Sequence, residues 1–376
     1  MKDQGRILGN LTDIARGLPE APAHGGRRRE AESRYGIPKE ELLDFSASIN
    51  LLGPPPAAIA AIRKTAAEIA HYPEESSREL SALVAEYLDV LPGEVVLGNG
   101  SSEIIYWLAA VLSPRRVLVI DPTFSEYRRA CRAAGAEVGS LLLPEDSGFA
   151  LDVKSIRPQG YDLVFICNPN NPTGYRASFD EIEHLWRNCR RAGAALAVDE
   201  AFVEFGGGLE SALTGGVAGG LYVIRSFTKS FALAGLRIGC LAADAEFATA
   251  MRRRLPPWNI NALAAAALAA ALADHSYQEM TRVATSRARE RLSAELGRID
   301  GVEPLPSAAN FILLRLKKGS AAAVVDNLGR FGILVRDCRS FPGLGDRFIR
   351  VAVRPERENH QLVAALRKVL HDRSAL

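Results

Sequence analysis

The chain contains 376 residues, of which 48% are hydrophobic and 24% charged, the proportions of a globular protein that can bury a sizeable core. Its 46 basic and 44 acidic residues leave a net charge of +2, so we expect neither a nucleic acid nor an anionic membrane as a partner. The five cysteines are widely spaced and form no CxxC pair, which argues against a disulfide framework or a metal site. No apolar signal-peptide core is visible, and the most apolar run, 262–273, is too short to cross a bilayer; we therefore expect a cytoplasmic protein.

Short apolar runs alternate with amphipathic stretches from about residue 80 onward. Each run is bounded by Gly, Pro, Asn or Asp and is typical of a buried strand; the runs are 95–97, 116–120, 162–167, 194–198, 221–224 and 238–242. Between them, 102–112 and 179–192 repeat apolar residues at helical spacing. This alternation predicts an α/β fold whose large domain, 71–260, holds a mostly parallel sheet covered by helices.

The rest of the chain predicts a second, smaller α+β domain. We expect a long helical region over 262–296, then strands at 310–316, 333–336 and 348–353 and a final helix over 359–370. We therefore assign 261–376 to a linking helix and the small domain, and the N-terminal segment, 1–70, would complete that domain.

Ligands of open parallel sheets bind at the carboxyl ends of the strands, so the polar residues after each predicted strand form the candidate site. The glycine-rich segment 98–102 leads into a helix and can bind a phosphate through free backbone N–H groups. The alternative is a plain strand–helix turn with serine as the helix N-cap. The segment 168–174 carries three asparagines and two prolines, more amide groups than a structural turn requires.

Two ionisable residues near strand ends suggest covalent cofactor chemistry. Asp199 ends a predicted buried strand, where it would pair either with an arginine or with the protonated ring nitrogen of a cofactor. Lys229 is the one lysine between 154 and 317; unless it is a surface lysine, its apolar setting would lower the pKa of an amine able to form an imine. Ser226 and Arg237 could both bind a phosphate. This set of groups suits pyridoxal phosphate.

The motifs NPTG (171–174), DEAF (199–202) and SFTK (226–229) follow one another in this chain. In these motifs and their spacing it resembles the fold-type I pyridoxal-phosphate enzymes of the aminotransferase class I/II superfamily. The resemblance implies a seven-stranded sheet and a homodimer with shared active sites. It implies that Lys229 forms the imine, Asp199 binds the pyridine nitrogen and Asn171 binds the phenolic oxygen. The further cofactor-binding residues that it implies are Ser101, Ser102, Phe124, Ser226, Arg237 and, reaching the partner subunit's phosphate, Tyr72.

Within this superfamily the chain is most similar to the L-threonine-O-3-phosphate decarboxylases of cobalamin biosynthesis, over about 24–370. The motifs that carry the similarity include HGG (24–26), DFSASIN (44–50), PWNINAL (257–263) and ILVR (333–336). The substrate-binding residues that it implies are His24, Gly25, Ser48, Asn171, Arg336 and Arg350. Two arginines suit a substrate with both a carboxylate and a phosphate, and an ordinary ion pair is the alternative for either.

The resemblance implies decarboxylation of L-threonine O-3-phosphate to (R)-1-amino-2-propanol O-2-phosphate, with Lys229 as the catalytic residue. A histidinol-phosphate-type aminotransferase is the alternative, although those enzymes usually have tyrosine in place of Phe202 and lack the HGG opening. Ser48 stands where the decarboxylases usually have asparagine, so O-phospho-L-serine is a second candidate substrate. A non-catalytic regulator would need an added DNA-binding domain, for which the segment before the large domain is short.

Overall fold

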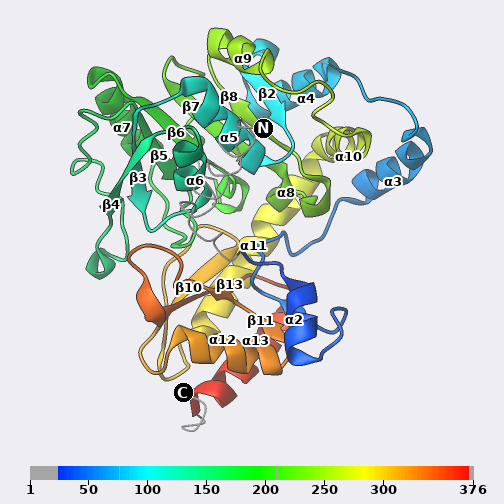
Figure 1. The fold of residues 1–376 in the computed structure, drawn as a ribbon. Coiled ribbons are helices and arrows are strands. Elements are labelled where there is room, and N and C mark those ends of the chain that lie inside the picture. Colours follow the sequence, from blue (N-terminus) through cyan, green and yellow to red (C-terminus); the bar gives the residue numbers. More distant parts are fainter. Residues whose placement is uncertain (1–23, 76, 209, 372–376) are drawn as a thin grey trace, which may run out of the picture.

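The computed structural model describes residues 24–75, 77–208 and 210–371. Its α-helices are α2 (Arg28–Tyr35), α3 (Pro56–Thr65), α4 (Arg78–Leu88), α5 (Ser101–Leu112), α6 (Glu126–Ala133), α7 (Phe179–Arg191), α8 (Phe227–Ser230), α9 (Ala245–Arg252), α10 (Ala262–Leu272), α11 (His275–Leu296), α12 (Ala321–Arg330) and α13 (Glu356–His371). The 3₁₀ helices are η1 (Ala66–Glu68), η2 (Pro92–Glu94), η3 (Glu145–Ser147), η4 (Val203–Phe205), η5 (Ala234–Leu236) and η6 (Gly345–Arg347). The strands form a seven-stranded sheet, a four-stranded sheet and a two-stranded sheet, and helices pack around them (Figure 1). Among the described residues, no helix has both the length and the apolar character needed to span a membrane.

The larger sheet has seven strands. They are β2 (Val95–Gly98), β3 (Arg116–Asp121), β4 (Glu137–Leu142), β5 (Leu163–Cys167), β6 (Ala195–Asp199), β7 (Leu221–Ser226) and β8 (Gly239–Ala242). Their order is β2-β8-β7-β6-β5-β3-β4, in which β8 runs antiparallel to both neighbours and every other pair is parallel. The predicted mostly parallel sheet is therefore confirmed. The carboxyl ends of β5, β6 and β7 meet at one edge of it, because these strands are parallel neighbours.

Strand β4 is the one strand of this sheet that no apolar run predicted. It lies at the edge beside β3, and its residues alternate between exposed and partly buried. A central parallel strand is buried on both faces and therefore reads as a continuous apolar run, whereas an edge strand that faces solvent does not need one. A search for apolar runs therefore misses β4.

Helices bury both faces of the large sheet, as the alternation of strands and helices predicted. In β5, Leu163 and Phe165 pack on one face with α5, α6 and α9, while Val164 and Ile166 pack on the other with α4, α7 and α10. Successive side chains of a strand point to opposite faces, so a strand in this position must be apolar throughout. The burial of both faces directs any ligand to the edges of the sheet, where the strands end.

The smaller sheet is antiparallel and contains β12 (Arg336–Asp337), β13 (Phe348–Ala352), β10 (Phe311–Leu316) and β9 (Val302–Pro304), in that order. Next to it, β1 (Leu43–Asp44) pairs in parallel with β11 (Ile333–Leu334), so the N-terminal segment does join the C-terminal region. Helix α11 runs between the two parts of the molecule (Figure 1). The boundaries at 70 and 260 stay predictions.

Two expected elements differ from the structure. The long helical region expected over 262–296 consists of two helices: α10 ends at Leu272 and α11 begins at His275. The carboxylate of Asp274 accepts a hydrogen bond from the backbone N–H of Tyr277 at 3.1 Å and so caps the start of α11. The expected strand over 333–336 divides at Val335 into β11 and β12, which belong to different sheets. Each break coincides with the end of an apolar run: Asp274 follows the run that ends at Ala273, and Arg336 follows Val335.

Candidate active site

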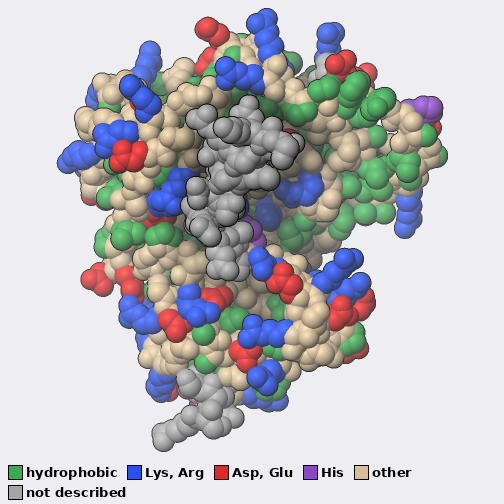
Figure 2. Space-filling view, in the orientation of Figure 1, with side chains coloured by type: hydrophobic (Ala, Val, Ile, Leu, Met, Phe, Trp, Pro, Cys, Tyr) green, Lys and Arg blue, Asp and Glu red, His purple; other side chains and the backbone are tan. Residues whose placement is uncertain are grey.

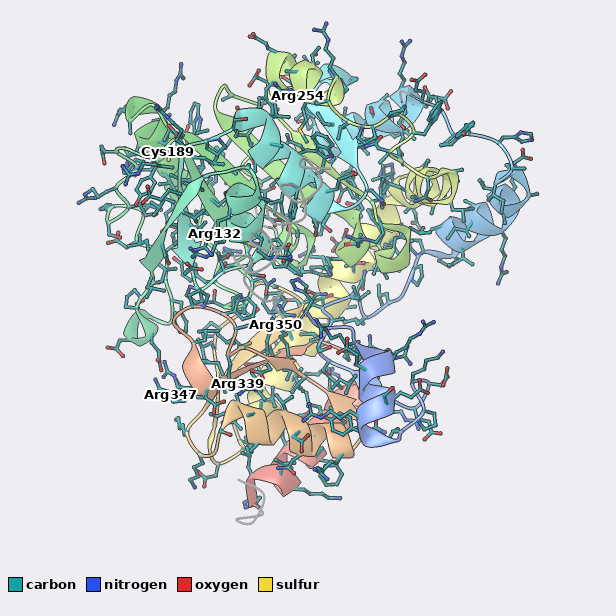
Figure 3. The ribbon with its side chains drawn as sticks, viewed as in Figure 1. Arg132, Cys189, Arg254, Arg339, Arg347 and Arg350 are labelled. Carbon is teal, nitrogen blue, oxygen red and sulfur yellow. The ribbon has the colours of Figure 1, made fainter. Side chains whose placement is uncertain are left out.

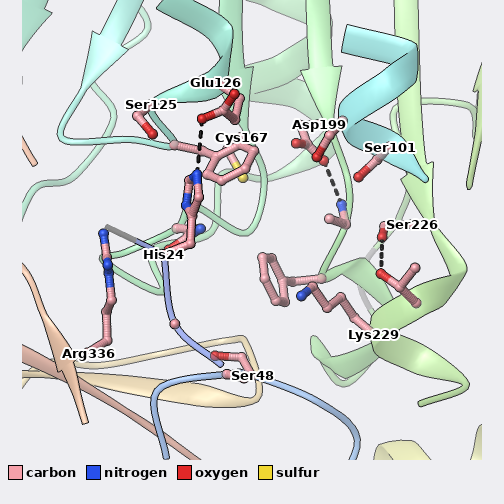
Figure 4. Close-up of a pocket in the computed structure, with 18 of the residues that line it drawn as sticks. His24, Ser48, Ser101, Ser125, Glu126, Cys167, Asp199, Ser226, Lys229 and Arg336 are labelled. Carbon is pink, nitrogen blue, oxygen red and sulfur yellow. Dashed lines mark hydrogen bonds and ion pairs between the residues drawn. The ribbon is translucent and has the colours of Figure 1, made fainter. Parts of the chain in front are cut away.

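One cavity of about 330 Å³ lies at the carboxyl ends of the central strands and extends to the smaller sheet. Every predicted site residue except Tyr72 lines it: His24, Gly25, Ser48, Ser101, Ser102, Phe124, Asn171, Asp199, Ser226, Lys229, Arg237, Arg336 and Arg350. Figure 4 shows several of these side chains converging from the strand ends and the N-terminal segment. The fold therefore gathers residues that are up to about 330 positions apart, from His24 to Arg350, into one site.

The start of helix α5 forms an anion-binding corner of this cavity. Its N-cap residue is Gly100, with φ 87°, and no described side chain caps the helix, so the alternative of a serine N-cap is wrong. A Cβ atom on Gly100 would lie 2.5 Å from Nη2 of Arg237, and one on Gly239 would lie 2.7 Å from the backbone nitrogen of Ser101. The two glycines thus let a guanidinium and a helix N-terminus approach each other closely, and both attract an anion.

Lys229 lies in α8, one turn after strand β7 ends at Ser226. Burial, together with the positive charges of Arg350 and Arg237, lowers the pKa of Lys229 to about 8, although Asp199 opposes this shift. The hydroxyl of Ser226 lies 2.7 Å from that of Thr228, which also lines the cavity. A partly buried amine whose pKa is this low is an effective nucleophile near neutral pH.

Asp199 is the last residue of β6 and is only 3% exposed. Its Oδ2 accepts a hydrogen bond from the Tyr127 hydroxyl at 2.6 Å, and its Oδ1 accepts one from the backbone N–H of Ala201 at 2.9 Å. Burial raises the pKa of Asp199, and these two hydrogen bonds and the charge of Lys229 partly offset that rise. The ion pair with an arginine, which was the alternative predicted for Asp199, is formed by the next residue instead: Glu200 pairs with Arg225 at 3.2 Å. Tyr127 had no signal in the sequence, because it lies 72 positions from Asp199.

Arg336 and Arg350 are direct partners in the register of β12 and β13, and both are buried. Arg350 donates hydrogen bonds to Oδ1 of Asn171 and, at 3.1 Å, to the carbonyl of Ser46. Both acceptors are neutral, so these contacts are not the ordinary ion pair that was the alternative for this arginine. Because Asn171 uses its Oδ1 in this way, its amide NH₂ group is available to donate to a ligand.

Two buried polar atoms in this region have no hydrogen-bond partner among the described residues: Nε of Arg350 and Oγ of Ser48. Figure 3 places Arg350 between the two parts of the molecule. Burial lowers its pKa to about 10, a value at which it remains a cation at neutral pH. Arg336 lies over the ring of Phe341, 5.2 Å from its centroid, and donates to Oγ of Ser340 at 3.0 Å. Buried donors of this kind generally have a partner, which points to a polar ligand in the cavity.

The N-terminal segment closes one side of the cavity. A Cβ atom on Gly25 would lie 2.1 Å from the carbonyl oxygen of Ser46, so only glycine allows the segment to pass this close. His24 donates through Nε2 to Oε1 of Glu126 at 3.1 Å, and its ring centroid lies 5.8 Å from that of Phe124 (Figure 4). Glu126 was not predicted as a site residue, since its contact with His24 spans 102 positions.

Tyr72 is the predicted site residue that lies outside the cavity. It is 81% exposed, and its ring stacks on that of Trp258 with 4.5 Å between centroids. The role implied for Tyr72 requires a second subunit, so it stays a prediction.

The residues present fit pyridoxal 5'-phosphate. The close approach at Gly100 and Gly239 leaves a corner for a phosphate group, which Ser101 and Arg237 would hold. Asp199 has a carboxylate oxygen for a protonated ring nitrogen, and Lys229 has an amine of lowered pKa for an aldehyde. Each of these groups belongs to the one cavity.

Comparison with known proteins agrees with this assignment. The family described as aminotransferase class I and II matches residues 40–366. Threonine-phosphate decarboxylase of Salmonella typhimurium is 36% identical over 358 residues, covering 93% of this chain and 96% of that protein. Histidinol-phosphate aminotransferase of Roseiflexus castenholzii is 34% identical over 349 residues, covering 89% and 92%. The crystal structure of L-threonine-O-3-phosphate decarboxylase from Porphyromonas gingivalis has a TM-score of 0.80 at 27% identity, covering 88% of this chain and 100% of that one.

The family match spans most of the chain, and both sequence relatives are similar along nearly their whole length. The predicted fold and the predicted superfamily are therefore confirmed. The two relatives catalyse different reactions, so they support the assignment to the family but do not decide the substrate. The chain belongs to the aminotransferase class I and II family, whose enzymes depend on pyridoxal 5'-phosphate.

Proposed function

We propose that this protein decarboxylates L-threonine O-3-phosphate to (R)-1-amino-2-propanol O-2-phosphate for cobalamin biosynthesis. The observation that carries the proposal is the pair of buried arginines, Arg336 and Arg350, which line the same cavity as Lys229. Each guanidinium can bind one oxyanion through two hydrogen bonds, so the pair suits a substrate with a carboxylate and a phosphate. The 36% identity to a threonine-phosphate decarboxylase supports this choice.

The surroundings of the two arginines favour one assignment of the substrate's ends. Arg350 lines the same cavity as Lys229 and donates a hydrogen bond to Oδ1 of Asn171. It would bind the carboxylate there, next to Asn171. Arg336 would bind the phosphate together with His24, which lines the cavity from the N-terminal segment (Figure 4).

Decarboxylation requires this chain to orient one bond and to supply one proton. When bound, the cofactor supplies a ring that accepts the electron pair released at Cα. Arg350 and the phosphate-binding groups would fix the orientation of the substrate's carboxylate, so that the bond from Cα to the carboxylate breaks rather than the bond to hydrogen. Carbon dioxide then leaves, and Nζ of Lys229 delivers one proton to Cα. Asp199, buried at the end of β6, would supply the carboxylate that pairs with a protonated ring nitrogen.

The proposal includes a homodimer in the cytoplasm. Tyr72, Ile69 and Trp258 are exposed hydrophobic residues, and Figure 2 shows hydrophobic side chains gathered over the arm that α3, α4 and α10 form in Figure 1. A second subunit on this arm would bury them and would bring Tyr72 to the partner's cofactor phosphate. The five free, buried cysteines are in keeping with a reducing compartment.

The test is to incubate the purified protein and pyridoxal phosphate with O-phospho-L-threonine and to measure carbon dioxide release without a keto acid. We expect release of the gas together with the amino-propanol phosphate, and loss of both in Lys229→Ala. O-Phospho-L-serine, tested in parallel, determines whether Ser48 permits the smaller substrate. Amino transfer that depends on a keto acid, without gas release, would contradict the proposal.

Histidinol-phosphate aminotransferase is the second candidate function, favoured by the 34% identity to such an enzyme. Phe202 argues against it, because those enzymes usually have a tyrosine there that donates a hydrogen bond to the cofactor. In this chain Phe202 is buried and packs edge-on against Phe311, with 5.0 Å between ring centroids. Histidinol phosphate with 2-oxoglutarate is therefore the competing substrate pair in the assay.

A further inference from the structure

A buried carboxylate, Glu126, lines the cavity in which we place an anionic substrate. Glu126 is the first residue of α6 and is only 6% exposed, and the chemistry proposed above does not use it. A negative charge beside a phosphate site weakens phosphate binding unless neighbouring groups neutralise it. The hydrogen-bond partners of Glu126 neutralise its charge and also indicate what the carboxylate does.

Three donors surround this carboxylate. Nη1 of Arg129 lies 3.0 and 3.1 Å from its two oxygens, the hydroxyl of Tyr106 donates to Oε2 at 3.0 Å, and Nε2 of His24 donates to Oε1 at 3.1 Å. Burial alone would raise the pKa of Glu126, but these hydrogen bonds and the charge of Arg129 lower it to about 2. The side chain is therefore a carboxylate at any physiological pH, and Arg129 balances its charge.

We infer that Glu126 is a positioning residue that holds the imidazole of His24 at the phosphate end of the cavity. This inference rests on the proposed function only in taking a phosphorylated amine as the substrate. Because Nε2 of His24 is engaged by Glu126, the ring is fixed in orientation and Nδ1 is the nitrogen left to face a ligand. Arg129 already balances the charge of the Glu126 carboxylate, so His24 is not needed for that balance and can contact the phosphate.

The Glu126 carboxylate does not need the hydrogen bond from His24 to be stable in its buried position. Arg129 lies one turn further along the same helix and Tyr106 lies on the neighbouring α5, so these two donors would satisfy the carboxylate without the N-terminal segment. The side chain of His24, by contrast, is 45% exposed, and among the described residues Glu126 is its hydrogen-bond partner. Without that bond, the imidazole would lose a fixed direction and would bind phosphate at a higher entropic cost.

The test compares ligands with and without a phosphate. We expect Glu126→Gln, introduced into the cofactor-loaded and inactive Lys229→Ala enzyme, to weaken binding of O-phospho-L-threonine about tenfold by calorimetry, equivalent to about 1.4 kcal/mol. Binding of L-threonine should change less than about twofold, and in the enzyme that keeps Lys229, KM should rise while kcat stays nearly constant, the pattern of a lost uniform binding contact. Adding the same substitution to His24→Ala should cause no further loss, because the two residues act as a unit.

Glu183→Gln is the matched control, since Glu183 forms a helix ion pair with Arg187 at 2.8 Å outside the cavity. Glu126→Met is the second variant if Glu126→Gln does not fold. Equal losses for the two ligands, or additive losses in the double variant, would overturn the inference. A wild-type enzyme that binds O-phospho-L-threonine without releasing carbon dioxide refutes the proposed reaction alone, and the binding comparison still decides the role of Glu126.

Discussion

Replacing Tyr127 by phenylalanine isolates the contribution of a single hydrogen bond to the cofactor site. The Tyr127 hydroxyl donates to Oδ2 of Asp199 at 2.6 Å, and its ring stacks on Phe165 with 4.9 Å between centroids and 6° between planes. Phenylalanine keeps the stacking and removes the donor. A hydrogen bond to a charged group contributes about 1.5–3 kcal/mol, so its loss leaves the Asp199 carboxylate less stable and raises the pKa of that group.

Because Asp199 is the group that would balance a protonated ring nitrogen, we expect the dissociation constant of pyridoxal phosphate to rise about ten- to a hundredfold in Tyr127→Phe. Titration of the cofactor-free variant with pyridoxal phosphate, followed by visible absorbance, measures this constant directly. Tyr222→Phe is the control, since Tyr222 is also a buried tyrosine but lies in β7 and packs on Phe247 instead. A dissociation constant within twofold of the wild type would refute the assignment of Asp199 to the ring nitrogen.

Three further predictions concern other parts of the site. The neutral amine of Lys229 is the nucleophile, so cofactor association, followed by stopped-flow absorbance, should accelerate as pH rises through about 8 and level off above it; a rate independent of pH would contradict the lowered pKa. Phe202→Tyr should shift the pH midpoint of the bound cofactor's absorbance down by about one unit, because the new hydroxyl donates to the phenolic oxygen; an unchanged midpoint would count against that contact. Gly239→Ala should lower the free energy of unfolding by about 1–3 kcal/mol, because its Cβ would lie 2.7 Å from the backbone nitrogen of Ser101. Thermal melting measures the effect, and Gly93→Ala, with open space around its Cβ, should melt like the wild type.

Much of the fold was predictable from local patterns. The central strands must be apolar on both faces, and β5 shows why: its alternate residues contact helices on opposite sides of the sheet. Elements whose sequence carries no such constraint were not predicted correctly. Strand β4 is an exposed edge, and α11 begins after one capping aspartate, Asp274, only two residues beyond the end of α10.

The amino-acid order was enough to predict the family and its cofactor, because Lys229, Asp199 and the residues around them occur in short motifs that the chain carries intact. It could not identify the groups that support them. Tyr127 contacts Asp199 across 72 positions, and Glu126 contacts His24 across 102 positions. The residues next to Tyr127 and Glu126 in the sequence carry no motif that predicts these contacts. Such contacts form only when packing brings distant segments into the same buried space, where an unsatisfied carboxylate would be costly and must find its donors.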